Sequence, residues 1–156
     1  MVGKRYWWWA GGGLLLLLLL VLVMVVAEPA SWTSAPENSS PGDWIGEEQI
    51  KVYPDLIVLE VPGARWAGFT NTNSMDPLFD ETAHALEIMP ANPRDINVGD
   101  VISYQTPYGV MIHRVFKTGE DTEGYYYLVK GDNNPFPDPF KVRFEEVQGV
   151  VVAVVY

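Results

Sequence analysis

Few side chains of this protein could act as a nucleophile or a general base. Its 156 residues contain no cysteine, six serines and two histidines. Thiol nucleophiles, disulfide bonds and thiolate metal sites are therefore excluded. Two histidines could form a conventional zinc site only if carboxylates supplied most of the ligands, so we expect neither a metal nor another cofactor. Nucleophilic chemistry in this chain would depend on serine and histidine.

Ser74 is the serine best placed to be presented from a bend. The first four serines lie in a polar N-terminal segment, where nothing rigid could hold a hydroxyl against a base. Ser103 lies within a strand-like stretch, where its ordinary role is a hydroxyl on one face of a sheet. Ser74 instead follows an apolar strand and falls in the turn-forming residues 71–77.

His113 is the candidate base. On a strand its ring would share a face with Met111 and Val115, an arrangement typical of a buried structural histidine. As a base it would need a carboxylate to hold the imidazole in the right tautomer. The proline-rich residues 130–139 offer two such carboxylates. The other histidine, His84, is interpreted as structural or exposed.

Four short motifs occur in an order that resembles the type I signal peptidases, in the branch found in archaea and the endoplasmic reticulum. They are Ser74-Met75-Asp76-Pro77, Gly99-Asp100-Val101-Ile102, His113-Arg114-Val115 and Lys130-Gly131-Asp132-Asn133-Asn134, with Asp138 six residues past Asp132. In this branch a histidine takes the place of the lysine of the bacterial family. The resemblance covers about residues 70–149.

The resemblance implies a serine endopeptidase with Ser74 as nucleophile, His113 as general base and Asp138 as the acid that orients the base. Asp132 is a second important carboxylate of the pattern, and the sequence leaves open which of the two contacts His113. The chemistry is consistent, because a serine hydroxyl needs a base near neutral pH and histidine side chains titrate near pH 6.5.

The same motif implies the groups that would bind the oxyanion and the substrate. The backbone N–H of Ser74 is the natural first oxyanion donor, and the hydroxyl of Thr72 is the candidate second donor. Met75 is placed with them at the substrate-binding turn. Asn73 stands where the family commonly has glycine, which is a departure from the pattern.

Short strand-like runs must position these residues. They are 56–61, 65–70, 85–89, 101–105, 110–117, 125–130 and 148–155. Turn signals at 106–109 and 118–124 connect three of them as an antiparallel meander. No helical periodicity competes, so residues 49–156 are predicted to form a mainly β, small, twisted antiparallel domain, either barrel-like or two-layered.

The N-terminal part has a different character. Residues 7–27 carry no charge and as a helix would span roughly 31 Å, the thickness of the bilayer hydrocarbon. Lys4 and Arg5 place residues 1–6 in the cytoplasm and the β-domain on the extracytoplasmic side. A cleavable signal peptide is the competing interpretation, because 25–27 offers small residues, but the full spanning length favours an anchor. The Pro- and Ser-rich residues 28–48 are expected to be a flexible stalk.

Charge restricts the partners. Residues 28–156 hold 8 basic and 20 acidic side chains, a net charge of about −12, and such a field repels nucleic acid. The expected function is removal of signal peptides from exported preproteins with small residues one and three positions before the cut, beside membrane lipid at the cell membrane. The alternatives are a specialised protease of the same family for a narrow set of surface proteins, and an inactive tethered binding domain. Accessory subunits and oligomeric state are left open.

Overall fold

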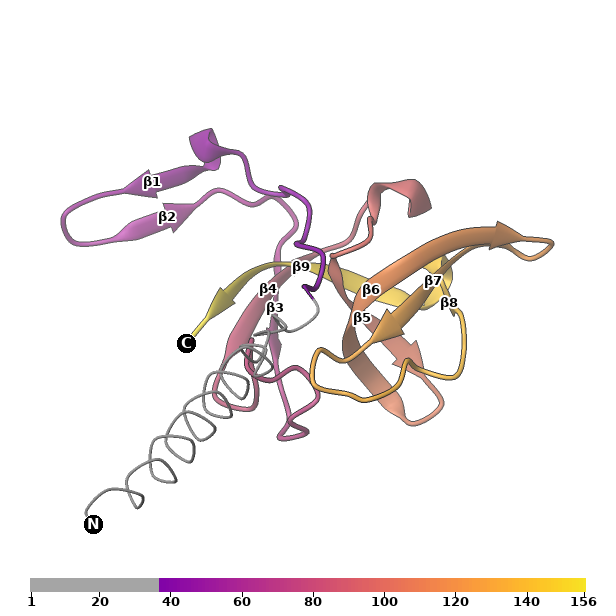
Figure 1. The fold of residues 1–156 in the computed structure, drawn as a ribbon. Coiled ribbons are helices and arrows are strands. Elements are labelled where there is room, and N and C mark those ends of the chain that lie inside the picture. Colours follow the sequence, from indigo (N-terminus) through magenta and orange to yellow (C-terminus); the bar gives the residue numbers. More distant parts are fainter. Residues whose placement is uncertain (1–36) are drawn as a thin grey trace, which may run out of the picture. The chain divides into compact units, whose positions relative to one another are not determined.

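The computed structural model describes residues 37–156 (Figure 1). The expected cytoplasmic terminus, the expected transmembrane helix (7–27) and the first part of the expected stalk lie outside the described residues. Within 37–156, no helix is both long and apolar enough to cross a membrane. The described helices are single 3-10 turns at Glu47–Gln49, Pro93–Asp95 and Phe144–Glu146.

The described chain is mainly β, and all its strand pairs are antiparallel, as predicted. Seven strands form one sheet in the order β3-β4-β9-β5-β6-β7-β8 (Figure 1). Their bounds are β3 Arg65–Gly68, β4 His84–Ile88, β5 Val101–Thr106, β6 Gly109–Asp121, β7 Gly124–Lys130, β8 Val142–Arg143 and β9 Val147–Val155. A separate two-stranded sheet pairs β1 (Ile50–Val52) with β2 (Ile57–Leu59).

Strands β5, β6 and β7 form the predicted meander, but its second turn is tighter than expected. The run predicted to end at Lys117 continues to Asp121, which pairs with Gly124. Gly124 has a φ of 108°, a conformation that glycine adopts without strain, so two residues suffice for the turn. Arg143 of β8 donates to both carboxylate oxygens of Asp121 at 3.0 Å and so ties the hairpin to the next strand.

Two strands were not predicted. β1 and β8 contain three and two residues, too few for an alternating pattern to stand out from the sequence around them. All three residues of β1 are exposed, so burial imposes no pattern on it.

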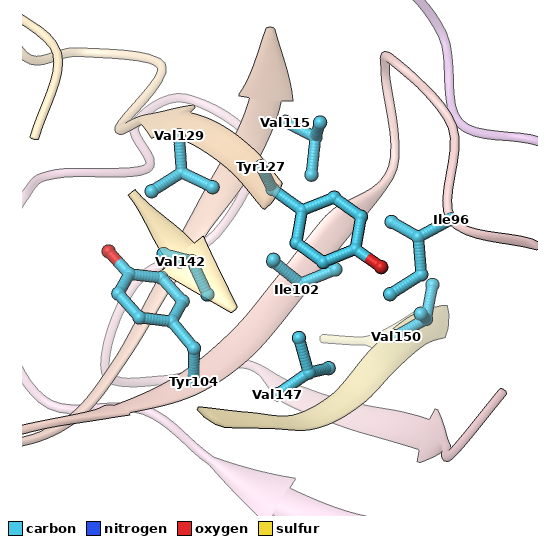
Figure 2. Close-up of a cluster of buried hydrophobic side chains, with 9 residues drawn as sticks. All are labelled: Ile96, Ile102, Tyr104, Val115, Tyr127, Val129, Val142, Val147 and Val150. Atoms are coloured by element: carbon cyan, nitrogen blue, oxygen red, sulfur yellow. The ribbon is translucent and has the colours of Figure 1, made fainter. Parts of the chain in front are cut away.

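The main core lies on one face of the central strands and is made of nine buried side chains (Figure 2). They are Ile96, Ile102, Tyr104, Val115, Tyr127, Val129, Val142, Val147 and Val150. Ile102 and Tyr104 point into it from alternate positions of β5, whereas Val101 packs into a second cluster with Met75 and Phe79. The segment between β3 and β4 supplies Met75 and Phe79, so packing of this segment determines where Ser74 is held.

The domain begins earlier than its composition suggested. Asp100 is fully buried, and its Oδ1 accepts hydrogen bonds from Gly42 N at 2.7 Å and Trp44 Nε1 at 3.0 Å. Gly99 has a φ of 105°, and a Cβ there would lie 1.9 Å from the Ser40 carbonyl oxygen. Residues 38–44 therefore belong to the domain by their contacts rather than to a flexible stalk, and the predicted boundary at residue 49 is too late.

Candidate active site

Ser74 lies in the turn that follows β3, between Asn73, which has an unusual backbone conformation, and Met75, which is buried. Asn73 has a φ of 54°, in the left-handed region that favours glycine and that asparagine also tolerates. The asparagine is thus compatible with this turn. Met75 is only 2% exposed and packs into the second cluster, which leaves the neighbouring Ser74 half-buried at the edge of that cluster.

Thr72 contacts both polar atoms of Ser74. Its Oγ1 lies 3.0 Å from Ser74 Oγ and accepts from Ser74 N at 3.4 Å. The second contact is long for a hydrogen bond and is therefore weak. The predicted oxyanion groups, the Ser74 N–H and the Thr72 hydroxyl, lie together, but they contact each other in this structure and would have to turn outward to meet a substrate.

His113 occupies the middle of β6 and is 3% exposed. Its Nδ1 lies 3.0 Å from Asp138 Oδ1 and 3.1 Å from Asp138 Oδ2. A backbone hydrogen bond of 3.0 Å from Asp138 N to Val129 O holds the aspartate against β7. Of the two carboxylates that the sequence left open, Asp138 is the one that contacts His113.

Tyr104 completes this network and was missed by sequence reasoning. It is fully buried, its hydroxyl donates to Asp138 Oδ2, and its oxygen lies 3.0 Å from His113 Nδ1. A proton on Nδ1 satisfies all of these contacts and leaves Nε2 as the ring atom free to accept a proton. Strand β5 pairs with β6 so that Ile102 lies opposite His113. Tyr104, two residues after Ile102, is therefore the diagonal neighbour of His113. Extending the predicted turn at 106–109 into a strand register would have given this pairing from the sequence.

The charges of the network follow from these contacts. Burial alone would raise the pKa of Asp138, but hydrogen bonds from His113 and Tyr104 outweigh it and hold that pKa below its usual range. Burial, with the adjacent Asp138, raises the pKa of Tyr104 well above that of an ordinary tyrosine. The carboxylate therefore stays ionised near neutral pH, and the phenol stays protonated and able to donate.

Asp132 has a different partner. Its two oxygens accept from Arg114 Nε at 2.8 Å and Arg114 Nη2 at 2.7 Å, and the two side chains are 9% and 11% exposed. Arg114 also donates from Nη1 to the carbonyl oxygen of Gly99 at 2.7 Å. Asp132 thus links the loop after β7 to the start of β5, and its Oδ1 also accepts a hydrogen bond from Asn38 Nδ2 at 3.3 Å.

That loop also contacts the serine. Asn133 N donates to the carbonyl oxygen of Ser74 at 3.0 Å, and Asn133 Nδ2 donates to that of Asn73 at 2.9 Å. A Cβ on Gly131 would lie 2.6 Å from the Ser74 carbonyl oxygen. One loop, residues 131–138, therefore holds the Ser74 turn at its first end and orients His113 at its last.

Ser74 and His113 line the same cavity, which has a volume of about 510 Å³. No hydrogen bond joins their side chains in the part of the chain that the structure describes; in enzymes without substrate, such contacts are often long. Thr72 and Met75 also line this cavity, whereas Asp138 and Asp132 do not. Phe79 is 4% exposed and lies in the wall of this cavity.

Part of the cavity wall is polar. Glu87 of β4 and Ser103 of β5 are 5% and 4% exposed, and Arg65 and Gln148 lie beside them in the lining. Burial raises the pKa of Glu87, and the Ser103 hydroxyl and the charge of Arg65 oppose this in part. His84 is exposed and stacks on Trp66 at 4.8 Å between ring centroids, as its structural or exposed interpretation anticipated.

No group of three or more His, Asp or Glu side chains in residues 37–156 is arranged to hold a metal ion. No family model matches this chain, and no curated protein or solved structure is significantly similar to it. What can be said of its chemistry therefore depends on the geometry of the residues themselves.

Proposed function

We propose that this protein is a membrane-tethered serine endopeptidase that removes signal peptides from exported precursors. The observation that carries the proposal is His113: its Nδ1 is held by Asp138, and it lines the same cavity as Ser74. An oriented imidazole facing a space shared with a serine at a bend is the arrangement that nucleophilic catalysis requires. The motif resemblance to the type I signal peptidases supports the substrate class.

In the proposed reaction, Ser74 Oγ attacks the carbonyl carbon of the scissile peptide bond while His113 Nε2 accepts the hydroxyl proton. Asp138 stabilises the imidazolium that forms. The imidazolium then protonates the leaving amine, and the C–N bond breaks to give an ester on Ser74. A water molecule, deprotonated by His113, hydrolyses this ester and restores the serine.

The oxyanion of the tetrahedral intermediate needs donors beside Ser74. The Ser74 N–H is in place but makes a weak contact with Thr72 Oγ1. A substrate oxygen entering between them would accept from both groups after rotation of the threonine hydroxyl. Asn133 supports this turn by donating to two of its carbonyl oxygens.

An anchor at residues 7–27 would restrict both enzyme and precursor to the plane of the membrane. A signal peptide is itself a hydrophobic segment, so tethering would raise the frequency of encounter and limit the orientations sampled. We accordingly place the β-domain on the extracytoplasmic side of the cell membrane, with the N-terminus in the cytoplasm.

The proposal is tested by cleavage of a precursor that has alanine one and three residues before the cut, with the full chain in detergent micelles. Ser74→Ala should abolish cleavage, because it removes the hydroxyl that attacks the peptide carbonyl carbon. Ser39→Ala is the matched control, since Ser39 is exposed and the hydrogen bond that it accepts from Arg114 ends on its backbone oxygen. Equal turnover by wild type and Ser74→Ala would refute the assignment.

The same assay would reveal a protease that accepts a narrower range of substrates. If the alanine precursor is not cleaved but a precursor with another side chain is, the chain is a specialised protease of the same chemistry. Loss of cleavage for every precursor tested, with the fold intact, would instead favour the inactive binding domain.

A further inference from the structure

The wall of the cavity carries one arginine that forms no ion pair with the rest of the described chain. Residues 37–156 hold eight Lys and Arg side chains, and five of them are ion-paired: Lys51, Arg94, Arg114, Lys141 and Arg143. Among the other three, only Arg65 lines the cavity, and it is exposed. Its guanidinium makes no hydrogen bond within residues 37–156. An acidic domain therefore presents an accessible cation in the same cavity as Ser74 and His113.

Gly149 leaves room for the Arg65 side chain at the backbone of β9. A Cβ on Gly149 would lie 3.3 Å from Arg65 Nη2, so the guanidinium lies close to this strand. Gly149 pairs with Ser103 of β5, and Ser103 pairs with Ile112 of β6. The guanidinium is therefore about two strand spacings, roughly 10 Å, from the strand that carries His113.

Gln148 supplies a second donor in the same wall. Val147 and Gly149 pair with neighbouring residues of β5, so Gln148 between them is the extra residue of a β-bulge. A bulge leaves its extra residue out of the ladder and can re-aim the side chain, and Gln148 lines the cavity. Its Nε2 makes a long hydrogen bond of 3.5 Å to Glu146 O. This bond is weak, so the amide can donate to a ligand instead.

The acidic side chains of the lining leave its Arg65 end suited to an anion. Glu87 faces Arg65 across the β3–β4 pair, but no ion pair joins them, and Glu87 is only 5% exposed. Burial raises the pKa of Glu87, which reduces the negative charge that could offset the guanidinium. Asp80, the other acid of the lining, accepts from Thr72 N at 3.2 Å and so lies at the Ser74 end. An anion would be attracted to one end and repelled from the other.

We infer that Arg65, with Gln148, binds a carboxylate of the peptide that enters the cavity, either an acidic side chain or a free C terminus. The guanidinium presents a fork of N–H groups that matches a carboxylate, and the Gln148 amide can donate to the same group. An extended peptide advances about 3.3 Å per residue, so the carboxylate would belong to a residue roughly three positions from the attacked bond. The inference rests on the proposed function for the cleavage but not for the binding.

The test uses peptides that differ by one charge. In amidated peptides of about ten residues, with alanine one and three residues before the intended cut, each other position is replaced in turn by Glu, Gln or Lys. A further set ends in a free carboxylate. Binding to the full-length Ser74→Ala variant in zwitterionic micelles is measured by calorimetry, and cleavage by wild type is measured separately.

The expected result is a preference for the anion at one position. Glu should bind there about fivefold more tightly than Gln at low ionic strength, the upper range for an accessible ion pair. The ratio should fall as salt is added, because salt screens such a pair. A gain confined to the set with a free carboxylate would identify the C terminus, rather than a side chain, as the bound group.

Variants assign the preference to Arg65. Arg65→Met removes the charge from an exposed side chain and should bring the Glu-to-Gln ratio close to one. Arg65→Lys keeps the charge without the fork of donors and should lower the ratio in part, as should Gln148→Leu. Lys117→Met is the matched control, because Lys117 is exposed and outside the cavity lining, and it should leave the ratio unchanged. If Arg65→Met does not fold, the wild-type ratio and Arg65→Lys still decide.

The two readouts separate this inference from the proposed function. Tighter binding of the anionic peptide without cleavage of any peptide supports the carboxylate site and counts against the protease. Cleavage with equal binding of Glu and Gln at every position, and no gain from a free C terminus, overturns the site and leaves the protease standing. A Glu preference that survives in a folded Arg65→Met, or tighter binding of Lys than of Glu, would also overturn the site.

Discussion

Tyr104 is the residue on which the hydrogen bonds of the candidate site converge. It is buried in the main core (Figure 2), yet its hydroxyl contacts both His113 and Asp138. Because Tyr104 lies between the core and the site, packing of the core determines where the Asp138 carboxylate is held. A tyrosine can therefore act here through the groups it orients, without touching a substrate.

Tyr104→Phe is expected to lower kcat by about tenfold or more with little change in KM, because Asp138 loses the donor that fixes one of its oxygens. The pKa of Asp138 should rise towards its ordinary value, since Tyr104 is one of the two donors that lower it. Steady-state kinetics across pH would measure both effects. Tyr127→Phe is the control: this buried tyrosine donates to Pro93 O at 2.6 Å, outside the site, and its loss should cost stability alone.

Substitution by asparagine should have different effects at the two aspartates: loss of activity at Asp138 and loss of stability at Asp132. Asp138→Asn should reduce cleavage severely, because an amide neither stabilises an imidazolium nor fixes the tautomer. Asp132→Asn should cost about 3 kcal/mol of stability, because it leaves the nearly buried Arg114 without its counter-charge. Unfolding curves and kinetics of both variants test this, and a reverse order of activity loss would exchange their roles.

Glu87 should make stability depend on pH in a defined direction. Its pKa in the folded state is raised by burial, so above the pKa of an ordinary glutamate the folded chain keeps a proton that the unfolded chain has released. Stability contributed by this group therefore falls as pH rises through that window. Glu87→Gln cannot ionise, and its denaturation midpoint should fall less between about pH 4 and pH 7. Glu145→Gln, at an exposed position, should follow wild type.

At the scale of elements, the loop 131–138 connects the two halves of the site. It contacts the Ser74 turn through Gly131 and Asn133, and it supplies Asp138 to the histidine. Its ends are fixed by β7 before it and by the hydrogen bond from Asp138 N to Val129 O. Movement of this loop would change the serine and the histidine together.

Gly131→Ala tests this coupling. The added methyl group would lie 2.6 Å from the backbone oxygen of Ser74, which is no flexible side-chain end, so the loop and the turn must separate. Overpacking of this kind costs about 1–3 kcal/mol, and cleavage should fall well beyond what this loss of stability explains. Gly46→Ala is the control, because a methyl group there meets only the mobile Glu48 carboxylate. Activity equal to wild type in Gly131→Ala would show that the loop does not couple the two halves.

At the scale of the whole molecule, the segment before the first strand is part of the folded domain. Asp100 accepts from Gly42 and Trp44 of this segment and from Asn97 N at 2.8 Å. A buried carboxylate that depends on these donors ties residues 38–44 to the start of β5. The polypeptide leading from the N-terminal part is thus attached to the same strand that carries Tyr104.

Trp44→Phe in the full chain should lower the free energy of unfolding by about 1–3 kcal/mol, because the buried Asp100 loses one donor while the aromatic packing is largely kept. Chemical denaturation followed by near-ultraviolet circular dichroism measures the change. Trp66→Phe is the matched control, since Trp66 is 61% exposed and its side chain makes no hydrogen bond within residues 37–156. Equal effects of the two substitutions would contradict a structural role for the segment.

Much of this architecture is local and could be read from the sequence. Strand positions follow from alternation and turn residues, and the meander 101–130 was predicted because its strands are consecutive in the chain. Ser74 and His113 stand out among six serines and two histidines, but their roles and those of Asp132 and Asp138 were implied by the motif resemblance. β1 and β8 were not predicted, because three and two residues are too few to show the alternation of buried and exposed side chains.

Partner choice was decided only by the tertiary structure. Asp132 and Asp138 lie six residues apart on one loop, and nothing local distinguishes which contacts histidine and which contacts arginine. Contacts between segments distant in sequence also determine the role of Tyr104, the burial of Glu87 and the docking of residues 38–44. Residue types and local patterns determined which chemistry was available, whereas sheet register and long-range packing decided which side chains meet, because those distances arise only when the strands pair.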